Sequence, residues 1–228
     1  MPITLSDYTF DDANTTVREK HEEVGGRDAR RIEIEGLVLG KTTVAAIEAE
    51  LDAILDAASK EDFSAELSLR AGRRLWVRRD AFTREVSAAA LVGSFELRLL
   101  AKDPFEESAQ ATSVVWSITA SGATRAFSSG GNATTGPVIT LVAAGEIVNP
   151  SFSDGVHLIG YSGIVADGAT LVFDGALGEV RLDGDDVTPY SRGSFPEIAP
   201  DGTTLIYTDD AASSHTASVT VAFHDRWW

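Results

Sequence analysis

The string that comes closest to a reaction motif is Gly36-Leu37-Val38-Leu39-Gly40-Lys41-Thr42, which lies between a predicted strand and a predicted helix. A phosphate-binding P-loop has four residues between its glycines, because that length sets the ring of N–H donors around the phosphate. Here three residues separate Gly36 from Gly40, and all three are apolar and continue the strand. The spacing therefore favours a strand that runs into a helix cap over a nucleotide site.

Other residue types that carry chemistry are few and scattered. The chain has no cysteine, which excludes disulfides and thiolate metal sites. No HExxH or Gly-x-Ser-x-Gly motif is present, and no two histidines stand at a helical i, i+4 spacing. The four histidines are His21, His157, His215 and His224. We therefore predict no enzymatic activity, no catalytic residue and no cofactor.

One turn, Asp183-Gly184-Asp185-Asp186, gathers the carboxylates that hard cations favour. Its glycine and spacing do not match an EF-hand loop. We predict a solvated turn and no metal site, with structural calcium as the alternative.

Four arginines, Arg73, Arg74, Arg78 and Arg79, flank Leu75-Trp76-Val77. Arginine beside an aromatic ring can stack on nucleic acid. However, the formal net charge is −16, which opposes binding to phosphates, so we predict no sequence-specific nucleic-acid partner. A subunit interface and a solvated strand edge remain as interpretations. We also expect the two terminal tryptophans to pack on this chain or on a neighbour. The candidate interface residues are Arg73, Arg74, Trp76, Arg78, Arg79, Trp227 and Trp228.

The first half of the chain is predicted to be a mixed α/β domain. An apolar stripe at steps of three or four predicts a helix over residues 43–59, capped by Thr42 or Thr43. The charged stretch of residues 20–28 is expected to be an exposed loop or arm. A turn at residues 70–72 is expected to join two strands, and Pro104 to end the last strand. Strands are predicted over residues 31–40, 63–69, 73–79 and 93–101.

The second half reads as all-β. Residues 106–112 are polar and without a clear period, so we place a domain boundary there, with domains 1–108 and 109–228. Asp-Gly turns separate short strands of fairly even spacing, which is typical of a sandwich or jelly roll. Strands are predicted over residues 112–119, 137–143, 156–161, 169–173, 178–182, 203–208 and 217–223. No apolar run approaches the ~18 residues of a membrane helix.

Two blocks of the sequence resemble the distal tail protein family of siphovirus-type, long-tailed phages. The first runs from Arg31-Ile32-Glu33-Ile34-Glu35-Gly36 through the helix to Ala101-Lys102-Asp103-Pro104-Phe105. The second contains Gly136-Pro137-Val138-Ile139, then residues 167–174 and 193–207, and closes on the strand that reaches Phe223. Asp201 stands where the family turn often has glycine, and Thr203 where asparagine is common.

The resemblance covers residues 28–228 and implies a fold that is mainly β with one long helix. It implies an N-terminal α+β ring domain followed by a galectin-like β-sandwich. It further implies a structural virion protein, made in the host cytoplasm and located at the tail tip or baseplate. There a homo-oligomeric, hexameric ring would join the tail tube protein to the hub and receptor-binding apparatus, near the tape-measure protein.

A carbohydrate-binding β-sandwich module is the alternative function, because galectin-like sandwiches can hold sugars on aromatic platforms. The aromatic side chains available for such a platform are Trp116, Phe152, Tyr161, Tyr190 and Tyr207. Each of them is more often a core residue, which is the interpretation we favour.

Overall fold

The computed structural model describes residues 2–24, 27–60, 63–101 and 103–228. Over these residues the protein is mainly β, with a single α-helix and several sheets. It forms two compact units, unit 1 (Met1–Ala109) and unit 2 (Gln110–Trp228). Among the described residues, no helix combines the length and the apolar character that crossing a bilayer requires.

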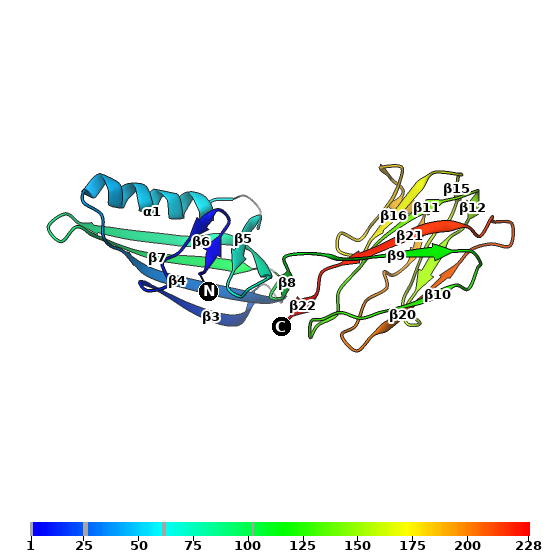
Figure 1. Cartoon of the computed structure of the whole chain (residues 1–228), viewed down its shortest axis with the longest axis horizontal. Helices are drawn as coiled ribbons and strands as arrows, with labels where there is room; N and C mark the ends of the chain where they lie inside the picture. The colour runs from blue at the N-terminus through cyan, green and yellow to red at the C-terminus, as the bar shows by residue number, and fades with distance from the viewer. Residues whose placement is uncertain (1, 25–26, 61–62, 102) are drawn as a thin grey trace. The chain divides into compact units, whose positions relative to one another are not determined.

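Unit 1 holds the helix α1 (Val44–Ala58) on one face of an antiparallel sheet (Figure 1). The sheet order is β2-β1-β5-β6-β7-β4-β3, and the short strand β8 pairs with β6. The strands are β1 (Thr4–Leu5), β2 (Tyr8–Thr9), β3 (Thr15–Val24), β4 (Arg27–Val38), β5 (Ala65–Ser68), β6 (Arg73–Ser87), β7 (Val92–Ala101) and β8 (Glu106–Ser108).

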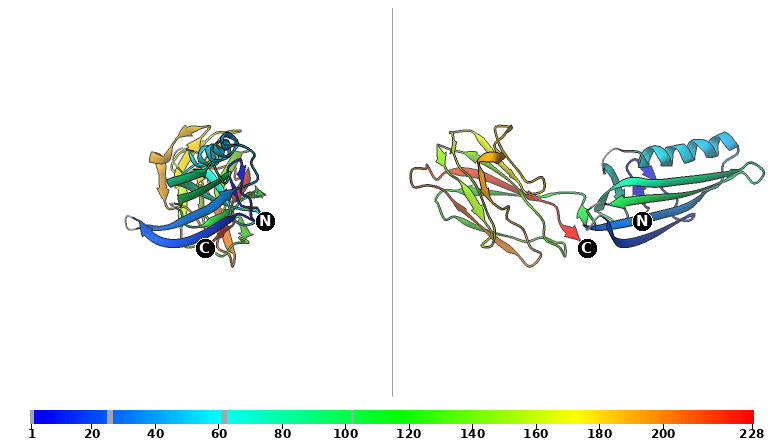
Figure 2. Two further views of the ribbon diagram at one scale, coloured as in Figure 1. Left: turned by 90° about the vertical axis from the view of Figure 1, so that its left-hand side faces the viewer. Right: turned by 180° about the vertical axis from the view of Figure 1, so that it is seen from behind.

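The helix forms where its apolar stripe predicts it. Ile47, Leu51 and Ile54 are fully buried against the sheet, and the rear view in Figure 2 shows the helix lying along that face. The Thr43 side chain accepts a hydrogen bond from the Ala46 amide at 3.1 Å, so Thr43 is the N-cap. The predicted helix is confirmed, and so is the turn before β6, where the Arg73 amide donates to the Arg70 carbonyl.

The expectation of a loop at residues 20–28 is wrong. β3 pairs antiparallel with β4 along the whole length of β3, from Thr15 opposite Gly36 to Val24 opposite Arg27. Residues 25–26, between the two strands, lie outside the described residues. The pattern is hidden because β3 is an edge strand, most of whose side chains are polar and exposed. Cross-strand pairs such as Arg18 opposite Glu33 replace the apolar alternation of a half-buried strand.

Two further strand boundaries differ from the prediction. β6 continues to Ser87 because a bulge between Arg79 and Ala81 shifts the register, so the inward alternation before the bulge breaks there. Beyond it Phe82 and Val86 pack on the core. The polar stretch predicted as a boundary contains β8 (Glu106–Ser108).

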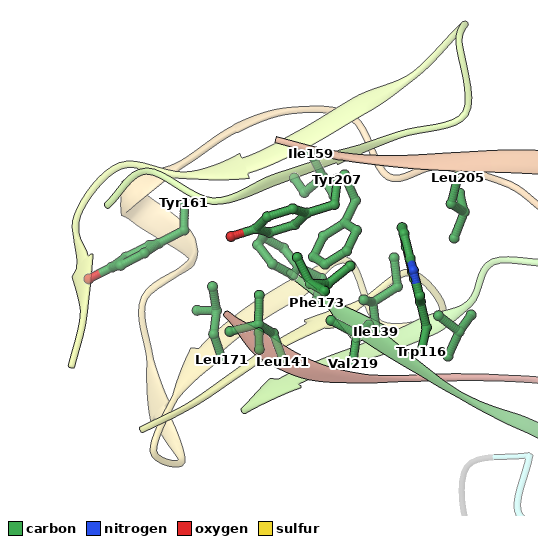
Figure 3. Packing of buried hydrophobic residues seen from close by; sticks show 14 of the residues in the cluster. Trp116, Ile139, Leu141, Ile159, Tyr161, Leu171, Phe173, Leu205, Tyr207 and Val219 are labelled. Carbon is green, nitrogen blue, oxygen red and sulfur yellow. The ribbon is translucent and has the colours of Figure 1, made fainter. Parts of the chain in front are cut away.

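Unit 2 consists of two main sheets that share one core. The strand orders are β10-β20-β13-β14-β19 and β18-β17-β16-β11-β21-β9. Figure 3 shows side chains of both sheets pointing toward one another, with Ile159, Leu205 and Tyr207 facing Ile139 and Leu171. This is the sandwich arrangement that the turn spacing predicts.

All seven predicted strands of unit 2 are present: β9 (Thr112–Ile118), β11 (Val138–Ala143), β14 (Leu158–Tyr161), β16 (Thr170–Asp174), β17 (Glu179–Leu182), β20 (Thr203–Thr208) and β21 (Ala217–Phe223). The remaining elements were not predicted, and most of them have only two or three residues, which carry too little period. They are β10 (Thr124–Phe127), β12 (Ile147–Val148), β13 (Ser151–Ser153), β15 (Ile164–Val165), β18 (Asp185–Asp186), η1 (Thr188–Tyr190), β19 (Ser191–Gly193) and β22 (Arg226–Trp227).

Candidate subunit interface

The arginine strand predicted from the sequence is the first half of β6. Leu75 and Val77 point into the core, while Trp76 lies on the other face with 38% of its surface exposed. The Arg74 guanidinium stacks over the Trp76 ring at 4.8 Å. Both side chains also donate to one oxygen of Glu107, from Arg74 Nε at 2.8 Å and Trp76 Nε1 at 2.7 Å. These contacts tie two predicted interface residues to β8 of their own unit.

Arg73 reaches the opposite side of β8, where it joins a buried ionic cluster. At the centre is Glu106, 3% exposed, whose carboxylate contacts Arg30 at 3.4 Å and Arg73 at 3.5 Å and also pairs with Arg70. Glu19 pairs with Arg30 and with Arg70. The cluster therefore joins β3, β4, the β5–β6 turn, β6 and β8.

Arg30 is the most deeply placed cation of this cluster, 4% exposed. Burial lowers the pKa of its guanidinium and the neighbouring Arg70 adds to that, whereas the Glu106 carboxylate acts in the opposite direction. Its Nε is buried without a hydrogen-bond partner, whereas its other nitrogens bond Glu19, Glu106 and the Pro104 carbonyl. The sequence signals none of this, because the charges are spread from residue 19 to residue 106.

The remaining candidate residues lie apart from this cluster. Arg78 is exposed and stacks over the Phe63 ring at 4.8 Å, and Arg79 donates to the Ser59 hydroxyl at 2.7 Å. At the end of unit 2, Trp227 is half-buried and Trp228 is 55% exposed, its amide donating to Asn132 Oδ1 at 2.8 Å. A role of these residues in subunit contacts stays a prediction.

The sheet of unit 1 has a second feature that the sequence did not reveal. Four long strands, in the order β6-β7-β4-β3, form its main part. In the part of the chain that the structure describes, the outer edge of β3 has no strand partner, and residues 81–87 of β6 pair with β7 alone. Both edges of this four-strand sheet are therefore open over much of their length.

The face of this sheet opposite the helix is polar. Its ion pairs include Arg18 with Glu35 at 3.1 Å and Arg98 with Glu96 at 2.6 Å. A hollow of about 560 Å³ crosses all four strands there, and its lining includes Thr16, Glu35, Leu37, Thr83, Glu85 and Glu96. No sequence motif marks this hollow, because each strand supplies only two or three of its residues.

The candidates for chemistry are placed as ordinary structural elements. Gly40, with a φ of 72°, lies in the short segment between the end of β4 at Val38 and the helix N-cap Thr43, which is the strand followed by a helix cap that the sequence predicts. Asp183 and Gly184 both have positive φ and join β17 to β18 in a tight hairpin turn. Asp183 Oδ1 accepts the Thr170 amide at 2.8 Å. Among the described residues, no three His, Cys, Asp or Glu side chains gather as metal ligands.

Two histidines pair with acidic side chains of unit 2. His157 Nδ1 lies 2.9 Å from Asp154, and His215 Nδ1 lies 2.7 Å from Asp209. The Asp209 carboxylate also accepts the Tyr207 hydroxyl at 2.7 Å. Each pair secures a loop beside a strand end.

Most of the aromatic residues considered for a sugar platform are in the core of unit 2. Trp116, Phe152, Tyr161 and Tyr207 are between 0% and 8% exposed, and Figure 3 shows Trp116 and Tyr207 pointing between the sheets. Tyr190 is the exception at 63% exposed. The interpretation of these residues as a sugar-binding platform is therefore wrong for four of the five, because their ring faces are buried and not open to a sugar.

No protein-family model matches this sequence, and no curated protein matches it. The fold matches the crystal structure of SPP1 Dit (gp 19.1) with a TM-score of 0.71, at 14% sequence identity. The match covers 100% of this chain and 99% of that chain. SPP1 Dit is described as a paradigm of the hub adsorption apparatus in phages that infect Gram-positive bacteria. The two proteins share one fold.

That likeness covers both units. At 14% identity, it is the backbone arrangement that corresponds rather than any set of side chains. The order of strands and turns in the sequence resembles a phage tail family, and the fold agrees with that resemblance.

Proposed function

We propose that this protein is a non-enzymatic structural component of a phage tail tip, forming a ring that joins the tail tube to the hub and receptor-binding apparatus. The observation that carries the proposal is the fold shared over the full chain with a phage hub adsorption protein. The sequence resemblance to distal tail proteins points to the same role. Its setting would be the virion, and its partners would be the tail tube, hub and tape-measure proteins.

The open edges of the four-strand sheet provide a route to such a ring. Neighbouring strands in β6-β7-β4-β3 are all antiparallel, so β6 and β3 run in opposite directions. When β3 of one copy meets β6 of the next, the antiparallel pattern continues without interruption. Each copy then uses two different edges, which is a heterologous contact, and repetition closes a ring. We propose six copies, as the family resemblance implies.

The helix decides which face of the sheet would point inward. A closed sheet has room for an additional layer on its outside, where the circumference is larger, as in barrels ringed by helices. The face opposite α1 would then line the opening, and with it Glu35, Glu85 and Glu96 of the hollow. An acidic lining repels DNA phosphates, which suits a conduit for passing DNA.

Cysteine cross-linking tests the ring directly, because the chain has no cysteine of its own. Thr16, Arg18 and Lys20 follow one face of β3, and the register places Thr83 of β6 on the same face of the sheet. We expect at least one of the double variants Thr16→Cys/Thr83→Cys, Arg18→Cys/Thr83→Cys and Lys20→Cys/Thr83→Cys to give an oxidised ladder up to six chains. Three pairs are needed because ring closure staggers the strands.

The matched controls are the four single-cysteine variants, which can form dimers and nothing larger. Mass photometry of the unmodified protein over a concentration series provides the second measurement, with six copies as the expected limit. The ring proposal is overturned if all three double variants stop at dimers while the unmodified protein stays monomeric.

A further inference from the structure

The strand β9 forms one edge of the six-stranded sheet of unit 2. It has seven residues, and all of them pair with β21, from Thr112 opposite Phe223 to Ile118 opposite Ala217. Among the described residues β21 is its only strand partner, and Figure 1 shows the two strands side by side. The backbone groups on the other side of β9 are therefore unpaired within the sheet, which makes them a template for a further strand.

The other edge strands of the two main sheets of unit 2 are short and charged. β18 has two residues, both aspartate, whereas β10 has four residues including Arg125 and β19 has three including Arg192. Short length and charge are common means by which proteins prevent pairing at a sheet edge. β9 has neither protection, because it is longer and no residue between Glu107 and Arg125 is charged.

The sheet face beside this edge is uncharged as well. The side chains of β9 that point away from the core are Ser113, Val115 and Ser117, and Val115 is 61% exposed. Thr220 of β21 lies opposite Val115, and Thr140 of β11 lies opposite Thr220. The formal net charge of −16 makes two copies of the chain repel each other over most of their surfaces. This edge and the face beside it add nothing to that repulsion.

The sequence of β9 is suited to pairing with a second copy of itself. When two β9 strands meet antiparallel with Val115 opposite Val115, Ser113 lies opposite Ser117 and Val114 lies opposite Trp116. Opposite residues point to the same face, so the serine and Val115 pairs share the outer face. Val114 and Trp116, which pack on the core of unit 2, share the inner face. Pairs of aromatic and β-branched side chains are among those that stabilise a sheet.

We propose that β9 is a self-association edge, at which two copies of the chain pair their β9 strands antiparallel about a two-fold axis between the two Val115 residues. The six-stranded sheets of both copies then form one continuous sheet. The contact is isologous, because each copy contributes the same strand. It uses unit 2 alone and does not depend on the ring, whose β3–β6 contact uses two different edges.

A disulfide tests this contact in the full chain, which has no cysteine of its own. Val115→Cys places two thiols opposite each other in the proposed pair, where the side chains are close enough for a disulfide. We expect mild oxidation to convert most of this variant to a dimer, and nothing larger, on a denaturing gel. Val142→Cys is the matched control, because Val142 is 40% exposed on the same face but belongs to the interior strand β11. It should give no more than a tenth as much dimer.

Two further variants test the register. In the proposed pair Ser117 faces Ser113 of the other copy and lies far from the second Ser117. Ser113→Cys/Ser117→Cys should therefore form the dimer as fully as Val115→Cys, whereas Ser117→Cys alone should form about a tenth as much or less.

Sedimentation equilibrium of the unmodified protein measures the same contact without a cross-link. A single strand pairing is weak, so we expect the mass to double only as the concentration rises well above that used in mass photometry. Val115→Lys places like charges opposite each other and should raise the dissociation constant of this step at least tenfold. Val142→Lys should leave it unchanged.

Either of two results would overturn the proposal. Equal dimer yields from Val115→Cys and Val142→Cys would show that the cross-link reports random collision. No dimer from Val115→Cys would show that β9 is not a self-contact, and would leave the edge to a strand of another protein. Because the ring test uses cysteines in β3 and β6, failure of one contact is distinguishable from failure of the other.

Discussion

Arg30 and Glu106 face each other at 3.4 Å inside unit 1, and each side chain is only 4% exposed. They are 76 residues apart in the sequence and come from β4 and β8. Because both charges have left water, each depends on the other and on Glu19, Arg70 and Arg73 for compensation.

Replacing Arg30 should therefore destabilise unit 1 strongly. We expect Arg30→Met to lower the free energy of unfolding by about 3 kcal/mol, the usual effect of removing one partner of a buried pair. Urea unfolding followed by circular dichroism at 222 nm, which reports α1, measures this. Arg18→Met is the control, because the Arg18 side chain is 65% exposed, and it should change stability by less than about 0.5 kcal/mol. Equal effects of the two variants would contradict the assignment.

Position 36 requires glycine because the phenyl ring of Phe95 packs against it, and not because the backbone turns there. A Cβ at this position would lie 2.6 Å from Phe95 Cζ, which is far inside van der Waals contact. Gly36→Ala should lower the free energy of unfolding by about 1–3 kcal/mol through overpacking. The double variant Gly36→Ala/Phe95→Leu should recover part of that loss in the same urea titration. A Gly36→Ala protein as stable as the parent would show that the sheet adjusts freely.

The helix cap offers a test with a neighbouring control. Thr43→Ala removes the hydrogen bond to the Ala46 amide and should reduce stability by about 1 kcal/mol. Thr42→Ala, one residue earlier and exposed, should change it by less than about 0.5 kcal/mol. Thermal unfolding of both variants, side by side, provides the measurement, and the opposite ranking would assign the cap to Thr42.

The lowered pKa of Asp154 makes the stability of unit 2 sensitive to acid. Burial alone would raise the pKa of Asp154, but hydrogen bonds from the Glu197 and His157 amides, the His157 ring and the Val156 amide outweigh it and lower that pKa to about 2. A carboxyl whose pKa is depressed on folding stabilises the protein above its unfolded pKa of about 4 and loses this effect as the pH falls to about 2.

We therefore expect the free energy of unfolding of unit 2 to decrease between about pH 4 and pH 2. The fluorescence of the buried Trp116 is the probe for this measurement. Asp154→Asn should be less stable at pH 7 by about 1–3 kcal/mol and should show a flatter acid profile. The same contact raises the pKa of His157, chiefly through its hydrogen bond to Asp154. That contribution has the opposite sign and is lost as the pH rises through the folded pKa of His157. Identical acid profiles for parent and variant would exclude Asp154 as the source.

Among the aromatic residues of unit 2, Phe152 is a core residue and Tyr190 is a surface residue, so their substitutions should affect stability differently. Phe152 is fully buried, with ring centroids of Phe173 and Tyr207 at 5.7 and 5.5 Å. Phe152→Ala should cost about 3–5 kcal/mol of stability. Tyr190→Ala should change stability by less than about 0.5 kcal/mol, because its ring is 63% exposed. Chemical denaturation of both variants checks the contrast, and a stable Phe152→Ala protein would contradict the packing.

Local patterns in the sequence were sufficient to predict the helix and many of the strands. The stripe of Ile47, Leu51 and Ile54 predicted the helix, because apolar side chains at helical spacing must share one buried face. The seven predicted strands of unit 2 followed from short strand-like runs separated by turn signals such as Asp-Gly. The three-residue spacing between Gly36 and Gly40 favoured a strand and helix cap over a P-loop, because the length of that loop sets the ring of N–H donors around the phosphate.

Tertiary structure decided the features whose partners are distant in the chain. β3 looks like a loop because an edge strand has no buried alternation to display, and only pairing with β4 shows it. Glu106 reads as part of a polar boundary, yet folding buries it among arginines from three other segments. Charge and solvent exposure at such positions are set by neighbours that a local pattern does not contain. The open edges and the buried cluster of unit 1 therefore emerge only once the strands are in register.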